Sequence, residues 1–250
     1  MTVHFVGAGP GAADLLTLRA ASILGASPVC LYAGTYIGAA VLQHCPVGAQ
    51  LIDTQHLDLD AIISHLVEAD RAGHDVARLC SGDPSLYSAL AEQTRRLDDA
   101  GVPWDVTPGV PAYAAAAAIL GRELTVPELA QTVILTRAQA RSTAMPTSER
   151  LSEVAKIGGT LALHLAITRT RAVMAELLPE YGPDCPVAVV ADASTDREIV
   201  LQGTVSSIAD QVEAAGLKQA AVILVGPALA RPGSAESHLY SKRPRSGSPG

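Results

Sequence analysis

The sequence predicts an α/β fold of two domains, with residues 1–120 forming the first, residues 121–230 the second and residues 231–250 a tail. Short apolar segments alternate with helical patterns, and in the first half the apolar segments end in turns rich in glycine and proline. Strand, turn and helix in that order is the repeating unit of a parallel sheet. A chain of 250 residues with 48% hydrophobic composition is long enough to form two such cores.

In the first domain, each predicted strand leads through a turn into a predicted helix. Apolar residues spaced three and four apart predict the helix that begins at Leu59, and the helix after the third strand is expected to carry Leu86, Leu90 and Leu97 and to end near Gly101. Four strands are predicted, over residues 2–6, 27–33, 75–80 and 103–108, and further helices over residues 15–25 and 108–121. We therefore expect a parallel sheet.

The second half reads as a mixture of strands and helices with no internal repeat. A polar insertion at residues 137–150 separates its first strand from the rest. Strands are predicted over residues 132–136, 158–166, 185–194, 197–205 and 220–230, with one helix from Arg171 to Leu178 and another ending at Gly216. This pattern indicates a second α/β domain.

Charge and hydropathy exclude several classes of protein. With 18 basic and 25 acidic side chains, the net charge of −7 argues against a protein that binds nucleic acid through a general basic surface. No stretch reaches the roughly 18 apolar residues of a membrane span, and the N-terminus lacks the pattern of a signal peptide. We expect a cytoplasmic protein with a disordered basic tail over residues 231–250.

The four cysteines give no metal or disulfide pattern. Cys30, Cys45, Cys80 and Cys185 form no C-x-x-C pair. His44 beside Cys45, and His56 near Asp58 and Asp60, lack further partners at regular spacing. We expect no metal site.

The GAGPG loop at residues 7–11 follows a strand and precedes a helical pattern, which would place exposed backbone N–H groups at a helix N-terminus. A nicotinamide-dependent oxidoreductase is one hypothesis for such a loop. Two details argue against it: the third glycine of G-x-G-x-x-G is replaced by Ala12, and Pro10 removes a donor. The acidic residue that would bind the ribose after the second strand is also absent.

Two further turns follow predicted strands of the same sheet. In SGDP, residues 81–84, either Ser81 or Asp83 can cap the next helix, and Gly82 permits a tight turn. In TPGVPA, residues 107–112, two prolines and a glycine shape the entry to a helix. Because the carboxyl ends of parallel strands lie at one edge, we expect the three turns to meet in one ligand-binding crevice.

The joint pattern resembles the tetrapyrrole methylases, which transfer methyl groups from S-adenosylmethionine. The motifs are GAGPG-x-x-x-LLTLRA, LCSGDPSLY and TPGVPAYAAAAA, followed by LALHLAI and VILVG, and the resemblance covers about residues 2–227. It implies two α/β domains with the cofactor in the cleft between them, and a homodimer. Uroporphyrinogen methylases of this family carry a proposed proton-transfer Asp where Ala33 stands here, so that role is not carried over.

Within the family, LYAGTYI, SGDPSLYSAL and LHLAI are similar to the branch that methylates C11 of precorrin-4 in corrin assembly. The resemblance therefore implies an S-adenosylmethionine-dependent enzyme of cobalamin biosynthesis that releases S-adenosylhomocysteine. The cofactor-binding residues that it implies come from loops of both predicted domains. They are Pro10, Ser81, Gly82, Asp83, Leu86, Pro111 and Ala112 from the first, and Leu165, Ala193 and Ala221 from the second.

The tetrapyrrole substrate carries carboxylates, for which the planar guanidinium of arginine is suited. None of the arginines is assigned to this role, and no catalytic residue is identified. The candidates are Arg122, Arg137, Arg141, Arg169 and Arg171, while Tyr32, Tyr36, Tyr87 and Tyr113 are candidates for lining the macrocycle. Three alternatives stay open: a cobalt-containing precorrin or another ring position, a nicotinamide-dependent oxidoreductase, and a binding module without turnover.

Overall fold

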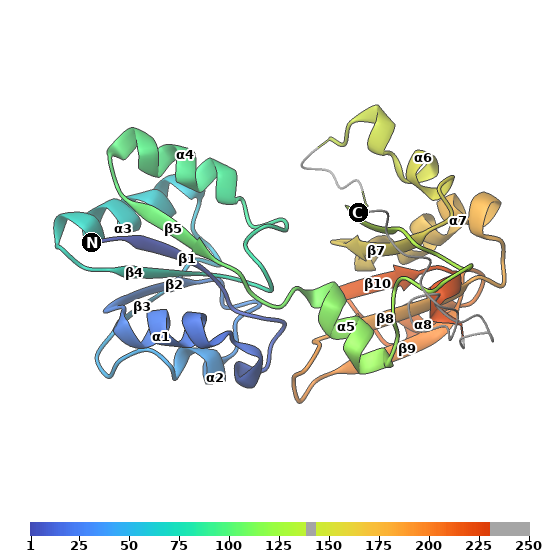
Figure 1. Ribbon diagram of the computed structural model, residues 1–250, viewed down its shortest axis with the longest axis horizontal. Helices are drawn as coiled ribbons and strands as arrows, with labels where there is room; N and C mark the ends of the chain where they lie inside the picture. The colour runs from blue at the N-terminus through green and yellow to red at the C-terminus, as the bar shows by residue number, and fades with distance from the viewer. Residues whose placement is uncertain (139–143, 231–250) are drawn as a thin grey trace, which may run out of the picture. The chain divides into compact units, whose positions relative to one another are not determined.

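The computed structural model describes residues 1–138 and 144–230 (Figure 1). The predicted disordered tail and Arg141 lie outside the described residues. The chain forms two compact units, one of Met1–Ile119 with Asp192–Ile199 and one of Leu120–Ala191 with Val200–Gly250. Each unit has its own five-stranded sheet, which confirms the predicted α/β fold class. No helix in the described ranges is long and apolar enough to cross a membrane.

The sheet of unit 1 has the strand order β3-β2-β4-β1-β5, and every neighbouring pair is parallel, as predicted. Its strands are β1 (Val3–Gly7), β2 (Val29–Tyr32), β3 (Gln50–Asp53), β4 (Val76–Cys80) and β5 (Trp104–Thr107). Strand β3 was not predicted. It is an edge strand in which three of four residues are exposed, so it lacks the apolar run on which the prediction relied.

Helices cover both faces of this sheet: α1 and α2 lie on one side, and α3 and α4 on the other (Figure 1). Phe5 and Val6, adjacent on β1, point to opposite faces and join different apolar clusters. The helices on these faces are α1 (Leu18–Ala26), α2 (Ala39–Leu42), α3 (Leu59–Arg71) and α4 (Leu90–Ala100), and the chain then continues into α5 (Ala112–Leu120).

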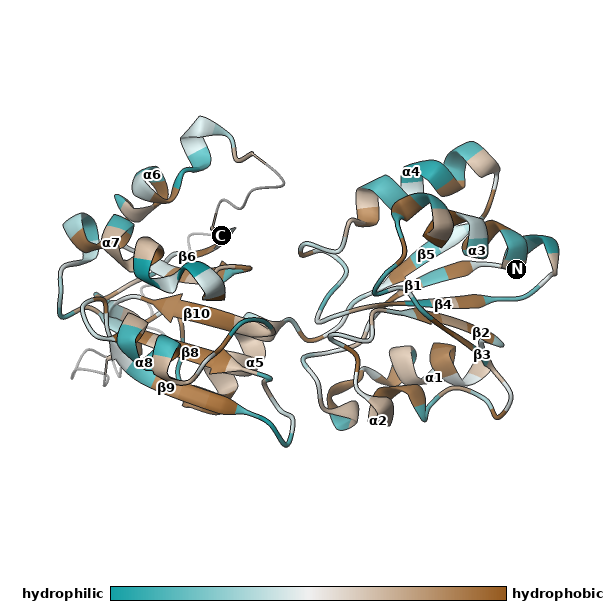
Figure 2. Ribbon diagram, turned by 180° about the vertical axis from the view of Figure 1, so that it is seen from behind, coloured by the Kyte–Doolittle hydropathy of each residue, from teal (hydrophilic) through white to brown (hydrophobic). Residues whose placement is uncertain are grey.

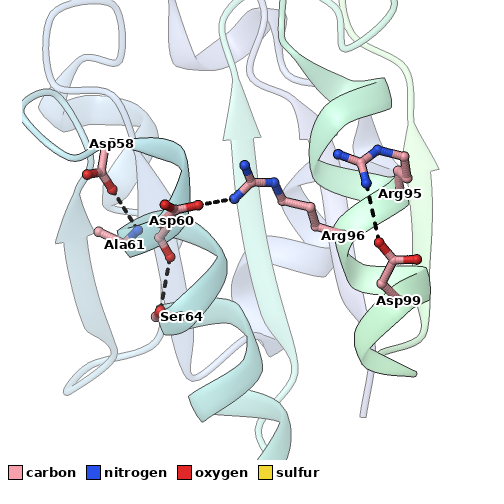
Figure 3. A network of polar contacts seen from close by, with 7 residues as sticks. All are labelled: Asp58, Asp60, Ala61, Ser64, Arg95, Arg96 and Asp99. Carbon is pink, nitrogen blue, oxygen red and sulfur yellow. Dashed lines mark hydrogen bonds and ion pairs between the residues drawn. The ribbon is translucent and has the colours of Figure 1, made fainter.

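Polar contacts fix the start of α3 and join it to α4 (Figure 3). The Asp58 side chain accepts a 2.8 Å hydrogen bond from the Ala61 N–H and so caps α3. Arg96 of α4 pairs with Asp60 in the first turn of α3. These contacts are at the surface, so the shared apolar cluster, which contains Leu66 and Leu97, provides most of the stabilisation between the two helices.

Several helix boundaries differ from the prediction, and α5, for example, begins at Ala112 rather than at residue 108. The first helix begins at Leu18 rather than at residue 15, because the Thr17 hydroxyl caps it by accepting from the Ala20 N–H. The fourth helix begins at Leu90, so Leu86 lies outside it and neither Ser81 nor Asp83 caps it. Residues 81–89 instead form an irregular segment, which we call the SGDP segment.

The strand order places a switch point between β4 and β1. The chain leaves β1 toward α1 on one face, whereas it leaves β4 toward α4 on the opposite face (Figure 1). Gly7 and Cys80, which end these strands, are partners in the parallel register. In open α/β sheets, ligands bind at the carboxyl edge where connections diverge in this way.

The second sheet is mixed, with the order β6-β7-β10-β8-β9. Strand β6 is parallel to β7, whereas β10 is antiparallel to both β7 and β8. Its strands are β6 (Val133–Arg137), β7 (Thr160–His164), β8 (Pro186–Ala191), β9 (Ile199–Thr204) and β10 (Ala221–Val225). The hydrophobic colour of β8, β9 and β10 in Figure 2 reflects their content of Val, Ile, Leu and Ala.

Three helices pack with these strands around one apolar cluster, to which Leu161, Leu177 and Ile208 contribute. The helices are α6 (Leu151–Ala155), α7 (Thr170–Tyr181) and α8 (Ile208–Ala214). Unit 2 is therefore built of strands and helices, with α6 as a short helix that was not predicted, while residues 192–199 belong to unit 1. Tyr181 anchors the end of α7 by donating a 2.7 Å hydrogen bond from its hydroxyl to the Gly159 carbonyl.

Candidate functional site

The loops that follow β1, β4 and β5 meet at the carboxyl edge of the first sheet. Gly9 and Gly82 exchange two backbone hydrogen bonds, of 3.1 and 2.8 Å. A Cβ on Gly109 would overlap the Gly82 carbonyl oxygen and would lie 2.8 Å from Gly7 Cα. Three backbones thus approach more closely than any side chain would permit. The predicted convergence of the three turns is confirmed.

Asp83 joins two of these loops through its side chain. One carboxylate oxygen accepts a 2.8 Å hydrogen bond from the Gly109 N–H, and the other accepts from the backbone N–H and the hydroxyl of Ser85. Partial burial acts to raise the pKa of Asp83, but these hydrogen bonds outweigh it and the pKa is lowered. The carboxylate is therefore ionised at neutral pH and holds the turn in shape.

The GAGPG loop differs from the expected anion cradle. The N–H groups of Ala8, Gly9 and Ala12 donate within unit 1, to Cys80 O, Gly82 O and Ser194 Oγ. Pro10 has no N–H, and the loop leads into a 3₁₀ turn at Ala13–Leu15 rather than into an α-helix. The expectation of a helix N-terminus was wrong, and the donors of Ala8, Gly9 and Ala12 hold neighbouring segments instead of remaining exposed.

A turn over residues 192–199 packs on the GAGPG loop. The Ser194 hydroxyl accepts a 3.0 Å hydrogen bond from the Ala12 N–H, and the Ser194 N–H donates to the Glu198 carboxylate at 2.8 Å. A Cβ on Gly11 would lie 2.5 Å from Thr195 Cγ2. Ala193, expected from the second domain, is buried in this turn and belongs to unit 1.

The structure brings the candidate residues of unit 1 to one edge. A Cβ built on Gly82 would lie 3.5 Å from both Ala112 N and Pro111 Cα, which are in ordinary contact distance of the SGDP segment. Leu86 is half-buried in that segment. The carboxylate of Asp83 is engaged within the turn, whereas Ser81, Ser85 and Tyr87 of the same segment are exposed.

The two remaining candidates, Leu165 and Ala221, belong to unit 2. Leu163 pairs with Ile223 in the antiparallel register of β7 and β10, so Leu165 and Ala221 lie at the same edge of the second sheet. Leu165 has a positive φ of 52° and an exposed fraction of 60%. A large apolar side chain is rarely held in that conformation at the surface, which makes Leu165 a notable feature of this edge.

The unassigned arginines and tyrosines have different surroundings. Arg171 is held by the carboxylates of Asp210 and Glu213, at 2.6 and 2.7 Å, on the surface of α7 and α8. Arg122 donates to the Leu229 carbonyl at 3.1 Å. These two arginines therefore have structural partners in unit 2. Tyr36 and Tyr87 are exposed, with fractions of 44% and 45%.

Sequence reasoning missed several residues that shape this edge. Gly7 was considered only as part of the GAGPG loop and Gly109 only as a turn former, whereas both are required by the close approach of β1 and the loop after β5. Ser194 was not singled out, because its partner Ala12 lies 182 residues away in the chain. The only available signal was the high density of glycine and proline at three strand ends.

These features define the class of protein: a chain of two α/β units with a glycine-lined loop edge at the switch point of a parallel sheet. The chain belongs to the tetrapyrrole (corrin/porphyrin) methylases, whose family model matches residues 2–209. The resemblance on the GAGPG, SGDP and TPGVPA motifs is confirmed.

Individual relatives match nearly the whole chain. A precorrin-4 C(11)-methyltransferase of Rhodococcus erythropolis is 57% identical over 241 residues, which are 96% of this chain and 97% of that protein. The solved structure of a cobalt precorrin-4 methyltransferase has a TM-score of 0.89 at 36% identity, covering 92% of this chain and 96% of the other. The uroporphyrin-III C-methyltransferase of Thermus thermophilus, complexed with S-adenyl homocysteine, has a TM-score of 0.78 at 27% identity, with 92% and 94% covered.

Proposed function

We propose that this protein transfers the methyl group of S-adenosylmethionine to C11 of precorrin-4, giving precorrin-5 and S-adenosylhomocysteine in cobalamin biosynthesis. The observation that carries the proposal is the 57% identity, over 96% of the chain, to a protein named for that reaction. The loop edge of unit 1 supports it, because its closely packed backbones and small side chains suit a ligand that is bound by shape.

The co-substrate supplies an activated methyl group on a sulfonium, and the electron-rich precorrin framework supplies the nucleophile. The protein therefore has to align the attacking carbon, the methyl carbon and the sulfur. In optimised intramolecular reactions, such alignment lowers the activation free energy by on the order of 7 to 11 kcal/mol. The sulfonium loses its charge in the transition state, so a carboxylate against the sulfur would oppose transfer. In unit 1, the carboxylate oxygens of Asp83 already accept hydrogen bonds from Gly109 and Ser85. This carboxylate is therefore held within the turn, where it would not oppose the transfer.

The cofactor-binding residues remain a proposal. In unit 1 they are Pro10, Ser81, Gly82, Asp83, Leu86, Pro111, Ala112 and Ala193, and in unit 2 they are Leu165 and Ala221. We assign the SGDP segment to the methionine part of the cofactor. In unit 1, the apolar surfaces of Leu86 and Ala112 are assigned to the surroundings of the sulfonium, where they would exclude water without adding charge.

A second candidate substrate is cobalt-precorrin-4. The solved structure with a TM-score of 0.89 is named for that substrate, although its identity to this chain is 36%. Both reactions form the same carbon–carbon bond, so the protein residues that hold the cofactor serve either substrate. The higher identity to the precorrin-4 enzyme favours the metal-free substrate.

Mass spectrometry tests the proposal in two steps. The ligand released by denaturing freshly purified protein is compared with S-adenosylhomocysteine, S-adenosylmethionine and NAD(P). The protein is then incubated with S-adenosylmethionine and either precorrin-4 or cobalt-precorrin-4. We expect S-adenosylhomocysteine and a product heavier by one methyl group with precorrin-4. Bound NAD(P), or no methylated product from either tetrapyrrole, would contradict the proposal.

We further propose a cytoplasmic homodimer. The resemblance to the family supports the homodimer, and its mass in solution can be measured by light scattering coupled to size-exclusion chromatography. All four cysteines are free thiols, as is usual in reducing compartments.

A further inference from the structure

Arg78 is a buried cation that has only neutral partners. It lies on β4, next to the switch point, and its exposed fraction is 8%. Its Nε donates to Gln93 Oε1 at 3.1 Å and its Nη1 donates to Thr54 Oγ1 at 3.2 Å. Within residues 1–138 and 144–230, no carboxylate forms an ion pair with it. Desolvation by burial lowers the pKa of Arg78. A buried charge of this kind is costly unless its hydrogen bonds are specific.

The contact with Gln93 leads to the SGDP segment. Gln93 Nε2 donates to the carbonyl oxygens of Ser88 and Ala89, at 3.1 and 3.2 Å. The end of the segment contains two residues with positive φ, Tyr87 at 55° and Ala89 at 54°. Such conformations persist only where surrounding contacts enforce them. Gln93, oriented by Arg78, provides two of those contacts.

The contact with Thr54 leads to the loops after β2 and β3. The Thr54 hydroxyl accepts from Arg78 and donates to the Tyr32 carbonyl at 3.1 Å. The neighbouring Asp53 carboxylate accepts from the Gly34 N–H at 3.0 Å. The loop from Ala33 to Gly38, which carries the exposed Tyr36, is therefore held at its start by residues that end β3.

We propose that Arg78 is a positioning residue that fixes the SGDP segment relative to the loops after β2 and β3. Its contact with Gln93 reaches the segment, and its contact with Thr54 reaches the two loops. This inference rests on the proposed function and deepens it, because the SGDP segment is the proposed cofactor site. The planar guanidinium directs Nε and Nη1 to two partners at once, whereas the single ammonium of lysine directs its donors from one point. The two contacts therefore require the planar geometry of the guanidinium and not its charge alone.

Two substitutions test the contact with Gln93 and the contact with Thr54 separately. Gln93→Glu keeps an acceptor for Arg78 but removes the donors to Ser88 O and Ala89 O, so we expect the Kd for S-adenosylhomocysteine to rise about tenfold. Thr54→Val removes the two side-chain bonds, to Arg78 and to the Tyr32 carbonyl, at nearly constant volume and leaves the backbone bond from residue 54 to Tyr32 in place. For this variant we expect the KM for the tetrapyrrole to rise about fivefold, while the Kd for S-adenosylhomocysteine stays within about twofold of the unsubstituted protein.

Arg78→Lys tests the guanidinium group that makes both contacts. The substitution keeps the positive charge but loses the planar pair of donors. We therefore expect both the Kd for S-adenosylhomocysteine and the KM for the tetrapyrrole to rise. Thr94→Val is the matched control, since Thr94 is also buried on α4 but its hydroxyl donates only to Ala91 O, within the same helix. Its Kd and KM should be unchanged, even if its melting temperature falls as far as those of the other variants.

Each outcome of this experiment is decisive. If the unsubstituted protein does not bind S-adenosylhomocysteine in calorimetry, the proposed function fails and this inference fails with it. If it binds, and folded Arg78→Lys and Gln93→Glu bind equally well, only the inference is overturned. Should Gln93→Glu fail to fold, Gln93→Met, which also lacks the donors and introduces no charge, is measured instead. Faster amide exchange in residues 82–89 of the variants is the expected accompanying result.

Discussion

The carboxylate of Asp83 accepts a 2.8 Å hydrogen bond from the backbone N–H of Gly109, so a side chain from the loop after β4 holds the main chain of the loop after β5. The two loops flank the one that follows β1, which lies between them in the sheet order. The bond therefore spans the switch point. It gives an acidic residue of a proposed cofactor site a role in shaping the site, without placing its charge against the ligand.

Asp83→Asn is expected to weaken cofactor binding. The amide keeps one acceptor oxygen but presents an NH₂ group to the donors of Gly109 or Ser85, so at least one hydrogen bond to a charged acceptor is lost. We expect the Kd for S-adenosylhomocysteine to rise about tenfold in calorimetry. Asp75→Asn is the control, because Asp75 accepts from the Thr2 N–H at 2.7 Å near the opposite edge of the same sheet. Equal affinities in both variants would contradict the assignment.

The same carboxylate predicts a pH dependence of stability. The pKa of Asp83 is lower in the folded protein than in the unfolded chain, so its contribution is present above the unfolded value of about 3.9 and is lost as the pH falls through the folded value. The difference in unfolding free energy between the unsubstituted protein and Asp83→Asn should be constant near neutral pH and shrink at acidic pH. Denaturant titrations at several pH values measure it, and a pH-independent difference would refute this origin.

Gly109→Ala is expected to disrupt the loop edge. A Cβ at this position overlaps the Gly82 carbonyl and lies 2.8 Å from Gly7 Cα, where only backbone atoms are present and none can rotate away. We expect a loss of about 2 kcal/mol in unfolding free energy and a loss of S-adenosylhomocysteine binding. In Gly25→Ala, the new Cβ meets the His44 carbonyl oxygen at an ordinary 3.6 Å within α1. That control should gain up to about 1 kcal/mol. Chemical denaturation of both variants checks the contrast.

Much of the fold could be predicted from the sequence, because buried strands are continuous apolar runs and helices carry apolar residues at regular spacing. The parallel first sheet, the mixed second half and the helix from Leu59 were predicted in this way. Strand β3 could not be, since it is an exposed edge strand that β2 recruits by main-chain pairing. The start of α4 was also misplaced. Residues 86–89 continue the helical pattern, but they form an irregular turn in which the Gln93 side chain donates to the carbonyls of Ser88 and Ala89.

The site was predictable in position but not in detail. Turns after parallel strands must lie at one edge, which brings the GAGPG, SGDP and TPGVPA motifs together. Which N–H groups remain for a ligand depends on contacts between distant residues, such as the 182-residue separation of Ala12 and Ser194. Single-sequence patterns carry no information on such pairs, and for that reason the use of the Ala12 N–H within unit 1 was not predicted.

Ala112→Leu is expected to block the proposed cofactor site. Ala112 begins α5 beside Gly82 and its side chain is half-buried, so a leucine would add bulk at this edge. Since Ala and Leu are both good helix formers, the helix itself should be little affected. We expect the Kd for S-adenosylhomocysteine to rise at least about tenfold with little change in melting temperature. Ala118→Leu, at an exposed position of the same helix, should bind as the unsubstituted protein does. Unchanged binding in Ala112→Leu would move the site away from α5.

Ser194→Ala tests whether the turn over residues 192–199 fixes the GAGPG loop. The substitution removes the acceptor of the Ala12 N–H but leaves the bond from the Ser194 N–H to Glu198 in place, so the turn itself should persist. We expect faster hydrogen exchange at Ala12, a loss of about 1 kcal/mol in unfolding free energy and a several-fold weaker affinity for S-adenosylhomocysteine. Ser64→Ala is the control, because the Ser64 hydroxyl donates only to the Asp60 carbonyl on the exposed side of α3. If exchange at Ala12 is the same in both variants, the contact does not order the loop. Faster exchange at unchanged affinity would show that the loop is ordered by the turn but that its order does not contribute to cofactor binding.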